Sequence, residues 1–470
     1  MMIVKSFLFD ELTPISIFHK LSKLFKEEFG ALFESAINSE SGNFSYLFFG
    51  TRERVFLKDG KTFHLDEMGE LNEISEDLFI YLKKRYKNID NSYYKKIAKE
   101  HNIGFTDGFI GYVGYECVKI FEPTLKKSMD GLKDPVQIAD LDLIRPKIVL
   151  AFSHKANKLT ILSFCEEMKE KIEKISLALY EPHLHTPLIK SEIDPAKGSF
   201  AISKDEFMKK VEESKKLIQD GDIFQILISN RFTQYSKIDY LSFYRVLRSK
   251  NPSPYMFLLN YTTHAIAGSS PEVMVGLKEG NIILRPIAGT RRRGKDVDED
   301  RAFEKELKED EKEKSEHVML IDLGRNDVNR VAKPGSVEVT DVMRIERYSH
   351  VMHMVSDIEG KLKEDSDMFD LFKSTFTAGT MTGAPKVRAM ELIAKFEGLK
   401  RGFYSGAVGY FGFDGNMDSA IMIRTSYLDD EKILFQAGAG VVADSKPELE
   451  FLEVKNKLAA LMSSLEDLKK

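Results

Sequence analysis

The sequence predicts a globular protein of mixed helices and strands, and two observations support this prediction. The chain has 470 residues, of which 43% are hydrophobic and 30% are charged, so it can bury a large core. Stretches with the alternation of a strand and stretches with the spacing of a helix are mixed along the sequence. Length alone allows two or three domains, although large single α+β folds also reach this size.

Residues 1–180 contain both kinds of element and form the first expected domain. Residues 44–65, FSYLFFGTRERVFLKDGKTFHL, predict short strands with a turn at Asp59–Gly60. Residues 74–89 have helical spacing, and residues 145–164 predict a hairpin of two buried strands. The glycines and aromatic residues of 105–122, FTDGFIGYVGYECVKIFE, indicate a strand and turn where backbones approach closely.

Residues 181–200 contain three prolines and no strong periodicity, which is typical of a linker between domains. We therefore expect a second domain over residues 200–465. Its first helix should begin after Ser203, which forms a capping box with Glu206, and should end at Gly221.

Residues 296–327 begin as a dense run of charges and end in an apolar stretch, HVMLIDL. The charges predict the solvated face of one helix with ion pairs four residues apart. The apolar end indicates that this helix enters the core, and Glu316 lies at the transition.

The overall charge excludes several classes of partner. A net charge of −5 gives no reason to expect nucleic acid or an anionic membrane surface. Cys117 and Cys165 are too few for a disulfide framework and lack metal-site spacing. Asp10 and Glu11 interrupt the apolar start of the chain, and no apolar run approaches the roughly 18–20 residues of a membrane span. These features predict a cytoplasmic protein.

Four loops in the second half of the chain place small residues beside fixed charges: PIAGTRRRG, FTAGTMTGAPKVRAME, IMIRTS and FQAGAGVVADS. Glycine lets an anion approach backbone N–H groups without a Cβ in the way. Arg424 ends an apolar strand pattern, and a buried arginine needs an anionic partner. Each loop alone could be a structural turn, but four together favour a site for a small polyanion.

Carboxylates and histidines offer the remaining chemistry. Glu316 and Glu453 both have apolar neighbours, and Glu450 lies near Glu453 on one predicted helix face. Such acids could hold Mg²⁺ against a carboxylate substrate, or they could be ordinary surface charges. His350 and His353 could be packed histidines, or one of them could be a general acid.

These motifs resemble those of the chorismate-utilising enzymes, and most of all their anthranilate synthase branch. The resemblance runs from about Asp205 to Asn456, through segments such as SEHVMLIDLGRNDVNRVAKPG, ERYSHVMHMVSDIEG and FTAGTMTGAPKVRAMELI. It covers the first 180 residues more loosely, through ALFESA and GFIGYVGYE. It implies two large, mostly antiparallel sheets in a sandwich, with flanking helices and a central active-site cleft.

The resemblance also implies Mg²⁺-dependent amination of chorismate by ammonia, followed by elimination of pyruvate to give anthranilate. By motif, Glu316 and Glu453 would bind Mg²⁺ and His353 would be the general acid. Chorismate is a dianion, so an arginine and backbone N–H groups suit one of its carboxylates. The residues expected to hold it are Gly289, Thr290, Tyr404, Arg424, Gly438, Ala439 and Gly440, the last three as a turn.

Feedback inhibition by tryptophan is a further implication of the resemblance. ALFESA is similar to a Leu-Leu-Glu-Ser element of the family, with Phe33 in place of a leucine. SPYM matches the family closely. Ser35, Pro254, Tyr255 and Met256 would then bind the inhibitor and bridge the two domains.

Two positions distinguish the branches of the family. Aminodeoxychorismate synthases carry a nucleophilic lysine where this chain has Ala288. Isochorismate and salicylate synthases carry a base lysine where it has Gln225, and a glutamine cannot act as that base. Ammonia should therefore come from outside, and neither cysteine has the context of a glutaminase nucleophile. We expect a separate glutamine amidotransferase subunit. The alternatives are an aminodeoxychorismate synthase component and a non-catalytic chorismate or tryptophan sensor.

Overall fold

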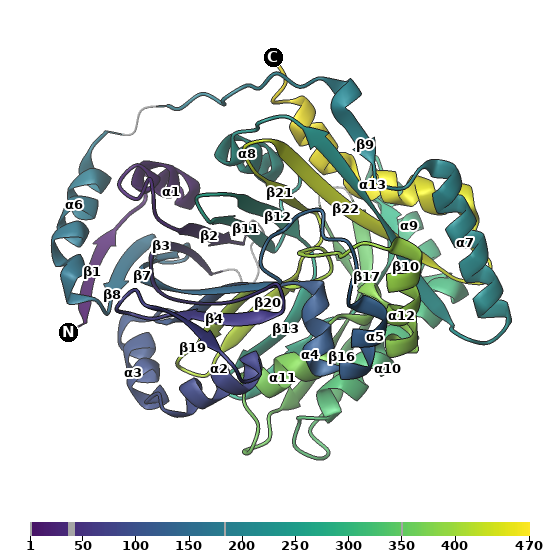
Figure 1. Cartoon of the computed structure of the whole chain (residues 1–470), viewed down its shortest axis with the longest axis horizontal. Helices are drawn as coiled ribbons and strands as arrows, with labels where there is room; N and C mark the ends of the chain where they lie inside the picture. Colours follow the sequence, from purple (N-terminus) through teal and green to yellow (C-terminus); the bar gives the residue numbers. More distant parts are fainter. Residues whose placement is uncertain (1, 36–42, 183–184, 349–350) are drawn as a thin grey trace.

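The computed structural model describes residues 2–35, 43–182, 185–348 and 351–470, and two antiparallel sheets in it share their two longest strands (Figure 1). These strands are β3 (Phe44–Lys58) and β7 (Leu141–Ser153). Their ladder is interrupted by a bulge between Thr51 and Glu53, and the halves on its two sides have different neighbours. Because a bulge bends and twists a strand, the pair passes from one sheet into the other.

The first sheet uses the half of β3 that precedes the bulge. Its strand order is β1 (Ile3–Leu8), β8 (Lys158–Ser163), β7, β3, β2 (Gly30–Glu34), β11 (Tyr255–Asn260), β12 (Ala265–Ser270), β21 (Thr425–Leu428), β22 (Lys432–Val441) and β10 (Gln225–Tyr235). The far edge of β10 pairs with β9 (Gly198–Phe200) and β18 (Gly383–Ala384).

The second sheet uses the half of β3 that follows the bulge. Its order is β5 (Leu71–Ile74), β4 (Lys61–Leu65), β3, β7, β6 (Gly108–Val113), β19 (Ala407–Gly412), β20 (Met417–Ile421), β13 (Val273–Lys278), β14 (Asn281–Leu284) and β17 (Val351–Lys361). β15 (Ile287–Arg292) continues beside β14 along β17, and β16 (Glu338–Arg347) lies on the other side of β17.

The first sheet is buried on both faces. Along β3, Tyr46 and Phe48 belong to one core, whereas Leu47 and Phe49 belong to another. Side chains alternate between the faces of a strand, so one core lies between the sheets and the other under the outer helices. This arrangement explains the nearly continuous apolar sequence of residues 44–49.

Helices cover the sheets on several sides (Figure 1). The second core includes residues of the helices that pack on the first sheet: α1 (Pro14–Ser22), α6 (Lys169–Tyr180), α7 (Lys204–Gln219), α8 (Tyr240–Lys250), α12 (Lys386–Glu397) and α13 (Pro447–Glu466). The others are α2 (Leu78–Lys87), α3 (Asn91–His101), α4 (Val118–Phe121), α5 (Lys126–Met129), α9 (Val297–Glu309), α10 (Glu311–Asn329) and α11 (Met368–Thr375).

Most local predictions are confirmed. The class is α+β with antiparallel ladders among the named strands, and Ser203 and Glu206 form the predicted capping box at the start of α7. The charged run was predicted as one helix, and this was wrong. Asp310 ends α9 and caps α10 with its side chain, so two helices form. An N-cap residue needs a non-helical backbone, which breaks the helix there.

The two predicted domains contribute strands to the same sheets. β2 of the first region pairs with β11 of the second, and β6 pairs with β19. The division at residues 181–200 and the central cleft stay predictions.

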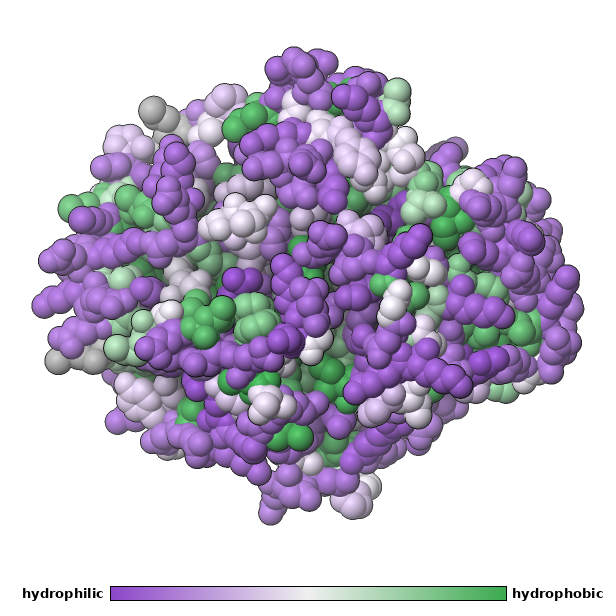
Figure 2. Space-filling model, viewed as in Figure 1, coloured by the Kyte–Doolittle hydropathy of each residue, from purple (hydrophilic) through white to green (hydrophobic). Residues whose placement is uncertain are grey.

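The face of the molecule in Figure 2 is mainly hydrophilic, with small scattered apolar patches. Within the described ranges, no helix is long and apolar enough to cross a membrane.

Candidate active site

His353 lies on β17, between Thr290 of β15 and Glu346 of β16 in the cross-strand register. Its Nδ1 lies 3.1 Å from the carbonyl oxygen of Gly289 and 3.0 Å from Oγ1 of Thr290. A carbonyl can only accept, so Nδ1 carries a proton and donates it. Burial lowers the pKa of His353, the bond to Gly289 raises it, and the charge of Arg424 lowers it. Within the part of the chain that the structure describes, Nε2 has no hydrogen bond.

Gly289 occupies a bulge that aims its carbonyl at His353. The register of β15 on β17 shifts between Ala288 and Thr290, and Gly289 has φ +67°. A Cβ at this position would lie 2.8 Å from Leu307 of α9. The backbone conformation therefore favours glycine, and any side chain here would also require Leu307 to shift.

The three arginines after Thr290 are occupied by carboxylates of α9, α10 and the residue between them. Arg291 pairs with Glu306, Asp310 and Glu313 at 2.7–3.2 Å. The other two pair with Glu299 and Asp300. These side chains hold the two helices against β15.

Arg424 differs from these three arginines in its surroundings. It lies just before β21 with φ +49°, a left-handed conformation that is uncommon for a residue other than glycine. Its carbonyl accepts the N–H of Ser269 at 3.1 Å. Among the described residues, however, its guanidinium has no hydrogen bond or ion pair. Burial lowers the pKa of Arg424, and Tyr404, Glu272 and Glu453 oppose this shift by their charges.

Tyr404 comes from the loop between α12 and β19 and is 2% exposed. Its ring lies 5.7 Å from the Arg401 guanidinium carbon. The next residue, Ser405, has φ +65° and hydrogen bonds through its backbone to Met422 and Thr377. Met422 lies two residues before Arg424, so its bond to Ser405 brings the Tyr404 loop close to that arginine, and the charges of Tyr404 and Arg424 influence each other's pKa.

Gly438, Ala439 and Gly440 were predicted as a turn, and this was wrong. They lie inside β22, in register with Ser229, Ile228 and Leu227 of β10. A Cβ on Gly438 would lie 2.5 Å from a Leu227 methyl, and one on Gly440 would lie 2.9 Å from Nε2 of Gln225. The small residues thus allow close packing of two strands. β21 pairs with β22 only as far as Phe435, so the described ladder leaves the other edge of this stretch open.

The expected metal ligands lie on two helices, each beside a second acid one turn earlier. Glu316 of α10 accepts a hydrogen bond from Gln225 at 3.0 Å, and Glu453 of α13 pairs with Lys457 at 2.6 Å. Burial raises the pKa of Glu313, and Glu316 raises it further. The pKa of Glu450 is raised by burial and by Glu453, and Lys312 of α10 partly opposes this.

The carboxylates of α10 and of α13 are hard oxygen donors, the kind of ligand that fits Mg²⁺. Burial is the main cause of the raised pKa values of Glu313 and Glu450, and the neighbouring Glu316 and Glu453 add to it. Within the described chain, no three or more His, Cys, Asp or Glu side chains are grouped closely enough to hold a metal ion. The two helices therefore present ligands in separate pairs.

Glu272 belongs to this site, although the sequence analysis missed it. It begins the segment that leads into β13, is 9% exposed, and accepts a hydrogen bond from Thr380 at 2.9 Å. Burial raises the pKa of Glu272 to about 7, against the effects of Thr380, Arg424 and Lys457. Its signal in the sequence, one acid after Ser-Pro, does not distinguish it from a surface residue.

The expected inhibitor residues come from neighbouring strands. Ser35 directly follows β2, whose Glu34 is opposite Met256 of β11. Tyr255 donates to Asp418 at 3.0 Å. Glu34, which the sequence analysis missed, accepts from Tyr244 and Arg248 through Oε2, whereas Oε1 is buried without a partner in the described chain.

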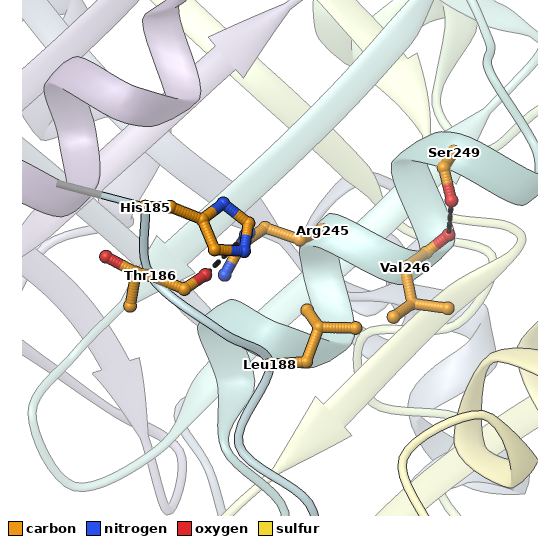
Figure 3. A pocket seen from close by; sticks show the side chains of 6 residues that line it. All are labelled: His185, Thr186, Leu188, Arg245, Val246 and Ser249. Atoms are coloured by element: carbon orange, nitrogen blue, oxygen red, sulfur yellow. Dashed lines mark hydrogen bonds between the residues drawn. The ribbon is translucent and has the colours of Figure 1, made fainter. Parts of the chain in front are cut away.

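Two adjacent surface cavities of about 360 and 310 Å³ lie elsewhere, between α1, α8 and the segment after Leu184. Figure 3 shows His185 and Thr186 beside Arg245 in the first of them. Neither is lined by a predicted site residue. His350, the second histidine considered, lies outside the described residues.

Comparisons with known proteins agree with the resemblance. Residues 33–463 match the family described as chorismate binding enzyme. Anthranilate synthase component 1 of Aquifex aeolicus is 41% identical over 98% of this chain and 93% of its own length. The protein of that name from Acinetobacter calcoaceticus is 44% identical over 77% of this chain and 75% of its own length.

Solved structures show the same fold. Anthranilate synthase component I from Streptococcus pneumoniae TIGR4 has a TM-score of 0.76 and 32% identity, covering 90% of this chain and 93% of that chain. The menaquinone-specific isochorismate synthase of Escherichia coli has a TM-score of 0.73 at 17% identity, covering 99% of this chain and 95% of that chain. At that identity the second likeness concerns the fold alone.

Proposed function

Since the chain belongs to the chorismate binding enzymes, we propose that it is the large subunit of an anthranilate synthase. Ammonia would add to the ring of chorismate as the allylic hydroxyl leaves. Loss of the enolpyruvyl side chain as pyruvate would then give anthranilate, the first step of tryptophan biosynthesis.

The observation that carries the proposal is the unpaired guanidinium of Arg424. A half-buried cation without a partner in the described chain has lost part of its hydration and gained little in return, unless a ligand supplies the anion. Its left-handed backbone is a local strain of the kind found at binding sites. We assign Arg424 to one carboxylate of chorismate, together with Tyr404, Gly289, Thr290 and the open edge of β22.

The residues at two further positions favour amination by free ammonia. Ala288 is buried on β15 opposite Met354 and has no nucleophile to offer. The amide of Gln225 donates to Glu316 and cannot take a proton from water. Both features argue against the aminodeoxychorismate alternative and against addition of water.

His353 is our general acid for departure of the hydroxyl. The Gly289 carbonyl fixes the proton on Nδ1. A proton on Nε2 is then present only in the imidazolium form, and we propose that this form protonates the leaving oxygen through Nε2. Hydroxide is a poor leaving group, so proton transfer in the transition state contributes strongly to the rate.

Glu316 and Glu453 would hold Mg²⁺, with Glu313 and Glu450 beside them. When bound, the ion would neutralise a substrate carboxylate and polarise the bond that breaks. Without it, four acids would face a dianion, which charge repulsion would exclude from the site.

We further propose that a glutamine amidotransferase subunit supplies the ammonia. Cys117 is buried and Cys165 is half-buried, and burial raises the pKa of each thiol. Such thiols are poor nucleophiles. The isolated chain should therefore turn over chorismate with ammonium but not with glutamine.

Tryptophan would bind where β2 and β11 meet, against Ser35, Pro254, Tyr255 and Met256. The unpaired Oε1 of Glu34 gives this site an acceptor for an ammonium group. Inhibition would arise if tryptophan and chorismate favour different arrangements of the two sheets.

Product identification tests the proposal. The purified chain is incubated with chorismate, Mg²⁺ and ammonium, and the products are identified by mass spectrometry. Anthranilate and pyruvate are expected. Aminodeoxychorismate would support the alternative, and unchanged chorismate would support a sensor. Glutamine replaces ammonium in a parallel assay, and turnover there would contradict the need for a partner.

A further inference from the structure

A short segment of the N-terminal region makes three hydrogen bonds to the loop that carries Tyr404. Oε1 of Glu116 accepts the N–H of Arg401 at 2.7 Å, and Oε2 accepts the N–H of Gly402 at 2.9 Å. The N–H of Tyr115 donates to the carbonyl of Gly402 at 2.8 Å. One carboxylate thus holds two successive peptide groups, which fixes the orientation of the backbone.

The side chain of Arg401 connects the same loop to the strands of the site. Its guanidinium pairs with Glu397 at 2.6 Å and is 1% exposed. It also donates to the carbonyls of Leu227 at 2.9 Å and Met381 at 2.8 Å. Leu227 is opposite Gly440 of β22, so one guanidinium joins the loop to the strand expected to receive chorismate.

Glycines let the two segments meet backbone to backbone. A Cβ on Gly114 would lie 2.9 Å from the carbonyl oxygen of Gly402. A Cβ on Gly406 would lie 2.3 Å from that of Val113. Neither position has room for a side chain, so the two backbones are in direct contact. Gly114 and Glu116, both in GFIGYVGYE, therefore act on the same contact, and Gly406 lies on its other side.

We propose that Glu116 is a positioning residue for chorismate, because it holds the Arg401–Ser405 loop so that Tyr404 stays beside Arg424. Glu116 is 2% exposed and acts through the loop, without contact to the substrate. The inference rests on the proposed function, since it assigns Tyr404 to chorismate.

Glu116→Gln is the direct test. The amide keeps the shape of the side chain but turns one acceptor into a donor that faces a backbone N–H. We expect the amides of Arg401 and Gly402 to exchange with deuterium about tenfold faster, and the KM for chorismate to rise about tenfold. The value of kcat should change less, because His353 is held by a different strand.

Asp142→Asn is the matched control. Asp142 is also a buried carboxylate of the N-terminal region, but its partner is Arg54. The Asp142→Asn variant should leave deuterium exchange in the Arg401–Ser405 loop and the KM for chorismate unchanged, even if the melting temperature falls. An equal effect of both variants would overturn the proposal, because general loosening of the region would explain it.

A double-mutant cycle with Tyr404→Phe asks whether Glu116 acts through Tyr404. Glu116→Gln should raise the KM much less in the Tyr404→Phe background, and independent effects would overturn the proposal.

If Glu116→Gln does not fold, Glu116→Asp takes its place and should show the same changes in exchange and KM. Wild-type exchange in that variant would overturn the proposal. Deuterium exchange does not require catalysis. It therefore tests the contact between Glu116 and the Arg401–Ser405 loop even if the wild type makes no anthranilate.

Discussion

The arginines that follow Thr290 and the arginine before β21 differ in their ion-pair partners. Arg291 has three carboxylates within 3.2 Å, and its neighbours pair with Glu299 and Asp300. Arg424 has no ion pair in the described chain and lies in a left-handed backbone conformation. In the sequence the first group looks like the anion site. We therefore base the assignment of Arg424 to the ligand on the absence of an ion pair among the described residues, rather than on the local density of charge.

The strongest test of this contrast is Arg424→Gln. We expect kcat/KM for chorismate to fall about a thousandfold, or about 4 kcal/mol, because a substrate carboxylate loses its charged partner. The free energy of unfolding should not fall, since no ion pair is lost. Initial rates over a range of chorismate concentrations and urea unfolding would measure both. Activity within tenfold of the wild type would mean that Arg424 does not hold the substrate.

His353→Ala asks whether the β15 side of the site contributes chemistry or only structure. Loss of a general acid should lower kcat about a hundredfold, with a smaller change in KM. His264, which stacks on Tyr261 away from the predicted site residues, gives the control variant His264→Asn with kcat near wild type. A kcat for His353→Ala within fivefold of the wild type would remove it as the acid.

The pH dependence of the free energy of unfolding tests whether Arg424 influences the pKa of Glu272. Burial raises the pKa of Glu272 from 4.5 to about 7 in the folded chain. The folded state therefore keeps its proton longer than the unfolded state does. The contribution of Glu272 to the free energy of unfolding is fully present below about pH 4.5, and it is lost as the pH rises through 7.

Urea unfolding of the wild type and of Glu272→Gln at several pH values would measure this loss. The wild type should lose on the order of 2–3 kcal/mol relative to the variant between pH 4.5 and 8. In Arg424→Gln the loss should be larger, because Arg424 lowers the pKa of Glu272. Parallel pH profiles of wild type and Glu272→Gln would show that Glu272 titrates normally.

Arg291→Gln should have the smallest effect. Its ion pairs are partly exposed, so the free energy of unfolding should fall by about 1 kcal/mol. The value of kcat/KM should change less than about threefold if Arg291 only holds α9 and α10 on β15. Arg292→Gln, at a more exposed side chain, is the matched control and should change neither. A large loss of kcat/KM in Arg291→Gln would remove the contrast with Arg424.

Local signals in the sequence predicted much of the fold. The Ser203–Glu206 capping box, the Asp59–Gly60 turn and the hairpin of residues 145–164 depend on neighbours within a few residues, and all are confirmed. The turn predicted at Gly438–Gly440 failed for the opposite reason. Its strand character comes from pairing with β10, which is distant in the sequence.

The candidate site shows the same limit. Arg424 and Glu316 could be found because charge stands out in an apolar pattern, and family motifs selected His353 over His350. Glu272 and Glu116 could not be found in this way. We assign each a role because a distant segment hydrogen bonds to its carboxylate. That segment is the loop of Thr380 for Glu272 and the loop of Arg401 for Glu116.

The pairing of early strands with late strands in both sheets has a consequence for synthesis on the ribosome. β2 and β6 leave the ribosome long before β11 and β19, the strands that cover their edges. Until then the nascent chain presents unpaired strand edges that other chains can join. The last partner strand of β6 is β19, so we expect the second sheet to stay incomplete until β19 has been made. Chaperone protection during this interval matters more here than for a chain whose first half is a self-contained domain.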